Sequence, residues 1–334
     1  MSRVGVTIGK FMPLHKGHEL LIRFGSMMMD DLVVVVSGNE GDEISVATRY
    51  GWVKEFTKTN DLTNVTVILH IDKSPIPKEI DEDGTVLDPK FQQYWVKEFQ
   101  LIASEATHFV SSDKYGSIMA DLLGIKWLPV DPDREMIQIS GTMIRNDPVR
   151  YFESLSNASK AHYIKKIAIV GPESSGKSTL VRELAATGVG AAIPEYGRTI
   201  SEARDNNLLE EDFLDIVDGQ QCLIDIATAS AKSSILLVDT EAYVTYLFSK
   251  KYLGSPTASI LEFAKTQEFD QYIVMSPEVE WIDDGSRVMG DQQEREQFFN
   301  DLIELLESNN ESFVVVSGTS YHDRVWEAYN HLKH

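Results

Sequence analysis

The chain has 334 residues, of which 43% are hydrophobic and 25% charged, and its formal net charge is −21. This length suits two domains, and the composition is that of a folded globular protein. The strong negative charge argues against nucleic-acid binding, which depends on Lys and Arg neutralising phosphates. No apolar run approaches the roughly 20 residues that cross a bilayer, and the N-terminus lacks a signal-peptide pattern. We therefore expect a cytoplasmic protein with small-molecule partners and no membrane or nucleic-acid partner.

The single cysteine, Cys222, excludes an internal disulfide and a cysteine-based zinc site. No motif surrounds it, so we expect it to pack in the interior.

The first half of the chain alternates segments typical of strands and of helices. The expected strands are 5–8, 31–36, 65–71, 108–111 and 125–130, and the expected helices are 17–29, 46–57, 89–103 and 115–123. Such alternation predicts a parallel, doubly wound sheet, which binds ligands at the carboxyl ends of its strands.

The second half repeats the alternation, after a polar stretch at residues 154–166 that we expect to be the domain junction. Its expected strands are 167–170, 191–193, 235–239, 272–275 and 313–316. The sequence therefore predicts an α/β fold with two doubly wound parallel-sheet domains, residues 1–153 and 167–334.

A complete phosphate-loop motif follows the first strand of the second half. Its residues are Gly171, Pro172, Glu173, Ser174, Ser175, Gly176, Lys177, Ser178 and Thr179. The glycines let backbone N–H groups surround phosphates, Lys177 reaches the β and γ phosphates, and Ser178 offers its hydroxyl to Mg²⁺. Asp239 ends an apolar strand and is the candidate magnesium-side carboxylate, although an Asp there is often only a turn former. The motif predicts an ATP site.

Two other segments of the second half are candidates for the rest of a phosphoryl-transfer site. Glu195, Tyr196 and Arg198 follow the second strand, where small P-loop kinases hold the phosphate acceptor. Tyr196 could stack on a flat ring, while Glu195 or Arg198 could hold hydroxyls. Arg287 and Arg295 could form a mobile lid over the γ-phosphate, although arginines beside acidic residues are also typical of a solvated helix face.

The first strand of the chain leads into the pattern G-x-F-x-P-x-H-x-G-H. Gly9, Lys10, Phe11, His15 and His18 are its candidate ATP-binding residues. Two histidines three residues apart at a strand-to-helix turn place ring N–H donors beside a helix N-terminus, which favours an anion. Paired histidines also occur in metal sites, but no third ligand stands nearby in the sequence.

A second segment, S-x-T-x-x-R, opens a helix at the end of the first half. Ser140 and Thr142 can cap this helix, and Arg145 can point toward the same phosphates. Capping alone would explain the Ser and Thr, so the segment gains weight only beside the histidine motif.

These two motifs together resemble the nucleotidyltransferases that move an adenylyl group from ATP to a nucleotide phosphate. Along nearly the whole chain, the order of the histidine motif, residues 147–152, the phosphate loop, residues 195–198 and residues 281–287 resembles the NadR-type bifunctional enzymes. These join a nicotinamide-nucleotide adenylyltransferase to a ribosylnicotinamide kinase. Some members carry an N-terminal helix-turn-helix domain, but the first transferase strand begins here at Arg3 or Val4, so we expect no repressor role.

The resemblance implies a Rossmann-like nucleotidyltransferase in residues 1–153 and a P-loop kinase in residues 167–334. The kinase would phosphorylate nicotinamide riboside, and the transferase would join the resulting mononucleotide to AMP, giving NAD and pyrophosphate, with Mg²⁺ as cofactor and ATP as co-substrate. The implied catalytic residues are His15, His18, Arg145, Lys177 and Asp239.

Trp52 and Arg49 could reach the nicotinamide nucleotide, although a Trp buried against the sheet is as common. Two other hypotheses remain open, namely another nucleotide acceptor and a nucleotide- or NAD-sensing protein with one inactive half. The sequence does not distinguish the amide from the acid form of the pyridine, and it leaves a homo-oligomer open.

Overall fold

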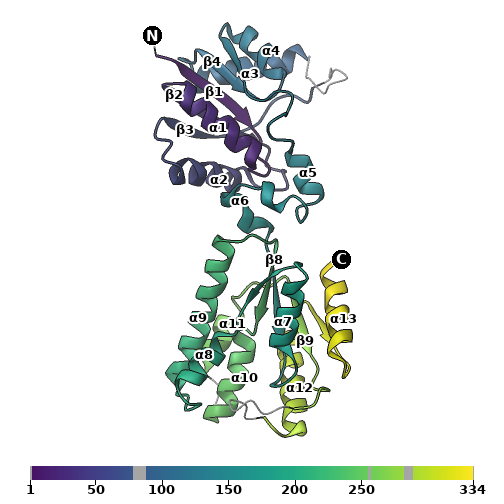
Figure 1. Ribbon diagram of the computed structural model, residues 1–334. Coiled ribbons are helices and arrows are strands. Elements are labelled where there is room, and N and C mark those ends of the chain that lie inside the picture. The colour runs from purple at the N-terminus through teal and green to yellow at the C-terminus, as the bar shows by residue number, and fades with distance from the viewer. Residues whose placement is uncertain (1, 78–87, 255–256, 282–288, 334) are drawn as a thin grey trace. The chain divides into compact units, whose positions relative to one another are not determined.

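The computed structural model describes residues 2–77, 88–254, 257–281 and 289–333. The chain divides into two compact units, Met1–His162 and Tyr163–His334, which we call the N-terminal unit and the C-terminal unit. Figure 1 shows that each unit contains one sheet covered by helices.

The sheet of the N-terminal unit has five parallel strands in the order β3-β2-β1-β4-β5. The strands are β1 Val4–Gly9, β2 Asp31–Gly38, β3 Val65–Ile71, β4 His108–Ser111 and β5 Lys126–Pro129. The helices are α1 Lys16–Met28, α2 Val46–Thr59, α3 Pro89–Ile102, α4 Tyr115–Leu123, α5 Gly141–Asn146 and α6 Asn157–Lys160, with short 3₁₀ turns η1 Phe152–Ser154 and η2 Ala161–Tyr163.

Successive residues of these strands face opposite sides of the sheet, and each side is covered by its own helices. Val6 and Val35 are fully buried in a cluster with Trp95 and Phe99 of α3 and with Met119 of α4. Helices α1 and α2 contact the same sheet. They cover its other face, because right-handed crossovers place the helices before β3 and the helices after β3 on opposite sides of the sheet when the direction of strand addition reverses. The strand order reverses between β1 and β4, so a ligand cleft is expected at the carboxyl ends of these two strands.

The C-terminal unit has a second parallel sheet in the order β10-β9-β6-β8-β7. The strands are β6 Lys165–Val170, β7 Ala191–Ile193, β8 Ile235–Asp239, β9 Gln271–Met275 and β10 Phe313–Val316. The helices are α7 Lys177–Ala186, α8 Tyr196–Ala203, α9 Glu210–Ala229, α10 Ala242–Leu253, α11 Ala258–Ala264, α12 Gln292–Ser308 and α13 Tyr321–Lys333.

Strand β6 shows how this sheet is buried on both faces. Ala168 and Val170 lie in a cluster with residues of α9 to α12. Ile167 and Ile169 face the other way and pack with residues of α7 and α13. A strand that is apolar at every position is therefore what the two helix layers require.

The α/β fold with two doubly wound parallel sheets is confirmed, and the expected elements differ from the observed ones by at most two residues at an end. The expectation for Cys222 is wrong, because this residue is exposed on α9. Its neighbours Gln220 and Ile224 are buried instead. In the described part of the chain, no helix is both long and apolar enough to cross a membrane.

Residues 154–166, expected to form the junction, pack largely on the N-terminal unit. The Ser159 hydroxyl is fully buried and donates to the backbone carbonyl of Leu14 at 2.7 Å. Leu155 forms a β-bridge with His15. The boundary between the units therefore falls at residues 162 and 163, and this segment supports the turn that carries His15.

Candidate functional site

The phosphate loop of the C-terminal unit has a backbone shape that its glycines allow. Gly171 and Gly176 have φ angles of 144° and 90°, in the region that favours glycine. A Cβ atom on Gly171 would also lie 2.6 Å from the Met275 carbonyl oxygen. The loop leads from β6 into α7, so its N–H groups and the helix N-terminus point to one place.

Lys177 and Asp239 meet beside this loop. The Lys177 ammonium donates to the carbonyls of Gly171 and Pro172, both at 3.0 Å, so it lies over the loop itself. Asp239 ends β8 and is 3% exposed. Burial raises the pKa of its carboxyl group, and the Lys177 charge opposes that shift.

The loop also offers oxygen ligands for a divalent cation. Ser178 and Asp239 line the same cavity beside the loop. One Asp239 oxygen, Oδ1, is buried and has no hydrogen-bond partner among the described residues. A hydroxyl and a carboxylate of this kind fit Mg²⁺, which prefers oxygen ligands and keeps waters and phosphates as the rest of its shell.

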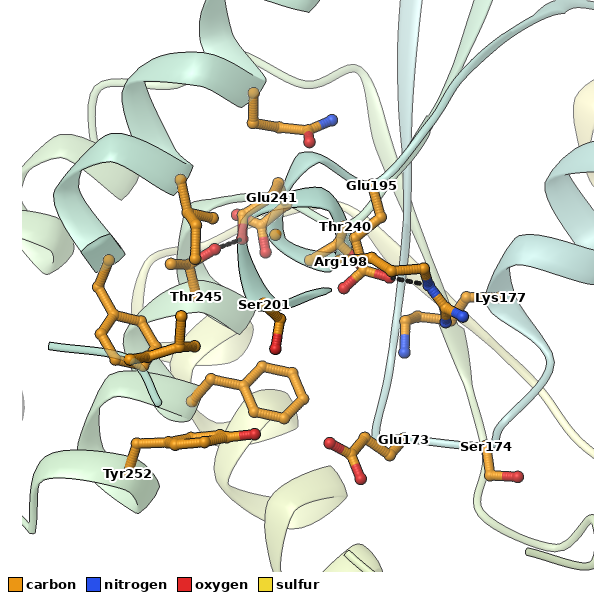
Figure 2. A pocket seen from close by; sticks show the side chains of 16 residues that line it. Glu173, Ser174, Lys177, Glu195, Arg198, Ser201, Thr240, Glu241, Thr245 and Tyr252 are labelled. Carbon is orange, nitrogen blue, oxygen red and sulfur yellow. Dashed lines mark hydrogen bonds and ion pairs between the residues drawn. The ribbon is translucent and has the colours of Figure 1, made fainter. Parts of the chain in front are cut away.

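A pocket next to the loop has one polar side and one aromatic side (Figure 2). Lys177, Glu195, Arg198 and Glu241 line the polar side, and Figure 2 shows Glu195 and Arg198 pointing toward Lys177. The aromatic side is formed by Phe213, Phe248 and Tyr252. Such a pocket suits a ligand that joins a flat ring to a hydroxyl-bearing sugar.

Two carboxylates of the polar side are held by their surroundings. Glu195 lies 3.8 Å from the Arg198 Nε. Burial raises the pKa of Glu195, the Lys177 charge opposes the shift and the Asp239 charge reinforces it. Glu241 caps α10 by accepting the backbone N–H groups of Tyr243 and Val244 at 2.7 and 3.1 Å. Burial raises the pKa of Glu241 to about 7.

The structure corrects the expectation for Tyr196. Its ring packs on Gly219 of α9, where an added Cβ would lie only 2.1 Å from the ring. Tyr196 is the first residue of α8 and is directed onto α9 instead of into the pocket. The aromatic role falls to Phe213, Phe248 and Tyr252, which the sequence did not distinguish from ordinary helix core residues.

The expectation of a mobile lid at Arg295 is also wrong. Arg295 is 1% exposed and donates to the carbonyls of Glu173 and Val279, both at 3.1 Å. A guanidinium held this way anchors the phosphate loop and does not swing over a ligand. Arg287, the other lid candidate, lies outside the described residues.

A second buried arginine, which the sequence did not point to, supports the same loop. Arg324 of α13 is 1% exposed and donates to the carbonyls of Ser175 at 2.8 Å, Ser276 at 3.1 Å and Gly318 at 2.6 Å. The bond to Ser175 belongs to the loop itself, and the bonds to Ser276 and Gly318 tie the loop to the segments that follow β9 and β10.

In the N-terminal unit, a cavity of 260 Å³ lies at the carboxyl ends of β1 and β4. This is where the strand order reverses. Its lining includes Gly9, Lys10, Phe11, His15, His18, Ser111, Arg134 and Ser140. The histidine motif and the start of the S-x-T-x-x-R segment are thus brought to one cavity.

The two histidines stack with ring centroids 3.8 Å apart. His15 is the N-cap of α1, and its Nδ1 accepts the Gly17 backbone N–H at 3.1 Å, so Nε2 carries the proton of the neutral ring. Burial, with the nearby Arg134 charge, lowers the pKa of His15 to about 4. Burial and His15 likewise hold the pKa of His18 well below its usual value. His18 Nδ1 is buried without a hydrogen-bond partner in the described structure.

The S-x-T-x-x-R residues adopt the expected helix start. Ser140 caps α5 by accepting the Met143 N–H at 3.2 Å. Arg145 donates to the Met12 carbonyl and to the Thr142 hydroxyl, which holds its guanidinium beside the histidine loop. Arg134 is a further cation at this cavity, and it belongs to no motif that would reveal it from the sequence.

Arg49 and Trp52 do not occupy a ligand-facing position. Arg49 is fully buried and donates to Asp42 and to the Lys10 carbonyl, each at 2.6 Å. It therefore braces the loop after β1. Trp52 is 8% exposed and packs edge-on against His162 at 5.5 Å.

A second cavity, which we call the aromatic pocket, shares Ile8, Gly9 and Lys10 with the histidine cavity. Its other lining residues are Ser37, Gly38, Asp72, Phe91, Trp95, Phe99 and Tyr115. The aromatic residues of α3 have the spacing of any amphipathic helix, so only the fold identifies them as pocket residues.

The chain is similar to known proteins over almost its whole length. A family model described as an AAA domain matches residues 166–324. The "Trifunctional NAD biosynthesis/regulator protein NadR" of Escherichia coli (strain K12) is 29% identical over 330 residues, which are 96% of this chain and 80% of that protein. The protein of the same name from Salmonella typhimurium (strain LT2) is also 29% identical, over 97% of this chain and 81% of that protein.

A solved structure has the same fold. The crystal structure of NadR protein in complex with NAD and AMP-PNP matches with a TM-score of 0.72 and 23% identity, covering 99% of this chain and 95% of that one. The NadR structure in complex with NR matches with a TM-score of 0.71 and 22% identity. The chain is thus homologous to the NadR proteins over almost its whole length, and each of its two parallel sheets carries one candidate phosphate site.

Proposed function

We propose that this chain is a bifunctional enzyme of NAD biosynthesis. The C-terminal unit phosphorylates nicotinamide riboside with ATP, and the N-terminal unit transfers an adenylyl group from a second ATP to the nicotinamide mononucleotide. The observation that carries the proposal is the pair of separate phosphate-binding cavities, each beside a pocket with aromatic walls. The curated relatives are named for NAD biosynthesis, which supports this choice of substrates.

In the C-terminal unit, the ribose is placed on the polar side of the pocket and the pyridine ring on the aromatic side. Glu195 accepts the proton of the riboside 5′-hydroxyl as its oxygen bonds to the γ-phosphorus, and the bond to the β-phosphate oxygen breaks to release ADP. Lys177 leaves the loop carbonyls and stabilises the charge on the transferred group. Ser178 and Asp239 would hold Mg²⁺, which supplies charge neutralisation of the phosphates.

In the N-terminal unit, a phosphate oxygen of the mononucleotide attacks the α-phosphorus of ATP, and pyrophosphate leaves. No protein nucleophile is required, so the residues act by position and charge. His15 donates through Nε2, and His18 Nδ1 can donate to a phosphate oxygen once its ring is protonated. Arg134 and Arg145 add fixed positive charge, which an acidic protein must concentrate at such a site.

Incubation of the purified chain with Mg²⁺, ATP and nicotinamide riboside tests the proposal. We expect mononucleotide, NAD, ADP and pyrophosphate, separated by chromatography. Mononucleotide and ADP alone would instead favour a sensing role or another acceptor for the N-terminal unit. No turnover at all would contradict the proposal.

Single substitutions separate the two activities. Lys177→Ala should lower kcat/KM for riboside phosphorylation by at least about 100-fold and leave adenylyl transfer to supplied mononucleotide intact. His18→Ala should have the opposite effect. Loss of both activities in either folded variant would show that the activities do not belong to separate units.

A further inference from the structure

The pocket beside the phosphate loop of the C-terminal unit has its charged residues in two groups. Lys177, Glu195 and Arg198 also line the cavity along the phosphate loop, so they belong to the phosphate side. Glu173 and Glu241 line the pocket and not that cavity, and no described cation shares this placement. The part of the pocket outside the phosphate cavity is therefore acidic as well as aromatic.

Glu173 is the carboxylate that lies beside the aromatic rings, because both oxygens of Glu241 cap α10. Glu173 Oε2 accepts the Met289 backbone N–H at 2.8 Å, and the Glu173 carbonyl accepts the Arg295 Nε–H at 3.1 Å. Burial raises the pKa of the Tyr252 hydroxyl, and the Glu173 charge raises it further. Figure 2 shows the Tyr252 hydroxyl directed toward Glu173. The carboxylate is thus held in place next to the aromatic side of the pocket.

The aromatic side is a wall of three rings from two helices. Phe248 and Tyr252 are four residues apart on α10, so they lie on one face of that helix. The Phe213 ring of α9 lies 5.8 Å from the Tyr252 ring and is tilted from it by 59°. The face of an aromatic ring carries a negative electrostatic potential, so such a wall attracts a cation as well as burying a flat ring.

We propose that Glu173 and this aromatic wall select a ring with a fixed positive charge over a neutral ring of the same shape. The inference rests on the proposed function of the C-terminal unit. In nicotinamide riboside the ring nitrogen is bonded to the ribose, so the pyridinium charge does not depend on pH. The Glu173 charge and the ring faces stabilise this cation, and they offer a neutral ring no equivalent attraction.

The charge of the ring separates the substrate from other ribosides that share its sugar. The bases of ordinary nucleosides are neutral near pH 7, and the 1,4-dihydro form of nicotinamide riboside has lost its ring charge by gaining a hydride. Each of these presents the same ribose hydroxyls to the polar side of the pocket. Contacts with the hydroxyls therefore do not reject them, whereas a site that requires a cationic ring does.

Calorimetric titration of the full chain with nicotinamide riboside and with benzamide riboside tests this selection. Benzamide riboside is the neutral, carbon-linked analogue with the same ring shape, carboxamide and ribose, so the ratio of the two Kd values isolates the ring charge. We expect the pyridinium to bind at least about tenfold more tightly. Glu173→Gln keeps an acceptor for the Met289 N–H and removes the charge. It should reduce the ratio about fivefold, by weakening the binding of the pyridinium.

Two further comparisons separate the local charge and the rings from general effects. Glu262→Gln is the matched control, because it removes the same charge from a side chain of this unit that is 74% exposed. It should leave the ratio of the two Kd values unchanged. Tyr252→Leu removes a ring face and should lower the ratio more than Tyr252→Phe, which keeps the ring.

The outcomes distinguish the failure of this inference from that of the proposed function. If both ribosides bind the wild-type chain equally well, or if Glu173→Gln weakens both to the same extent, the inference is wrong and the proposed function stands. If neither riboside binds and nicotinamide riboside is not phosphorylated, the proposed function of the C-terminal unit fails and the inference fails with it.

Discussion

His15 and His18 illustrate how burial controls charge at a phosphate site. Two imidazoles stacked at 3.8 Å with little water around them cannot both carry a charge at low cost. The free protein therefore keeps these rings neutral near pH 7, and the phosphates of a nucleotide would supply the negative charge that favours protonation. The histidine motif predicted an anion site, but only the packing shows that both imidazole rings are neutral in the free protein.

The low pKa of His15 predicts a loss of stability in mild acid. An unfolded histidine titrates near 6.5, whereas His15 titrates at about 4 in the fold. Between these values the unfolded chain binds more protons, so the free energy of unfolding falls as the pH drops. Full passage through this range would remove about 3 kcal/mol from the N-terminal unit.

Urea unfolding at pH 7.5 and at pH 5 measures this loss of stability. Hydrogen exchange of the β1 amides shows how much of the loss belongs to the N-terminal unit. His15→Asn should reduce the pH dependence, and His322→Asn, at a histidine side chain that is 90% exposed, should not. Equal pH dependence in the wild type and in His15→Asn would contradict the assignment.

Arg134 should contribute to adenylyl transfer although no motif contains it. It lines the histidine cavity, and its charge lowers the pKa of both histidines. We expect Arg134→Ala to raise KM for ATP in adenylyl transfer about tenfold, because one charge-assisted phosphate contact is lost. Steady-state kinetics of both activities would check this, with riboside phosphorylation as the internal control; an unchanged KM for ATP would exclude the contact.

The phosphate loop depends on elements far from it in the sequence. Arg295 of α12 and Arg324 of α13 hold the carbonyls on its outer side, and Gly171 and Gly176 supply the left-handed backbone. The loop motif is therefore only part of the site. The neighbouring helices fix the direction in which its N–H groups point.

Arg324→Met should destabilise the C-terminal unit and weaken ATP binding there. The variant leaves the buried carbonyls of Ser175 and Ser276 and the more exposed carbonyl of Gly318 without this donor, at a cost of about 2–4 kcal/mol. Thermal unfolding and KM for ATP in riboside phosphorylation measure the two effects. Arg204→Met is the control, because it removes an ion pair whose arginine side chain is 55% exposed. It should change the thermal stability and the KM for ATP by far less. Equal effects of the two variants would show that Arg324 has no special role.

Each unit has its own sheet and its own buried core, so each should fold alone. The position of the cut decides whether the N-terminal unit remains active. A fragment of residues 1–162 keeps Ser159, Leu155 and the contact of Trp52 with His162, whereas a fragment ending at residue 153 loses all three.

We expect the 1–162 fragment to retain adenylyl transfer and the 1–153 fragment to be less stable by about 2 kcal/mol or more, with reduced activity. Urea titration and adenylyl-transfer assays of the two fragments compare them directly. Equal stability would place the boundary at residue 153 after all.

The sequence by itself determined the fold class, the element order and the two phosphate motifs. These are local properties, because apolar periodicity sets helices and strands, and a glycine-rich turn before a helix can be identified without its distant partners. The tertiary structure decided the rest. Arg49, Tyr196 and Arg295 have polar or aromatic side chains suited to a ligand, but long-range packing turned each of them to a structural use.

The same long-range packing created sites that no local pattern encodes. Trp95 and Tyr252 come from helices whose apolar spacing is that of ordinary core helices, and Ser37 comes from a buried strand. Whether such residues line a pocket depends on which strand ends lie side by side and which helix covers them. Contacts between residues distant in sequence decide this, and the local pattern around any one of them does not.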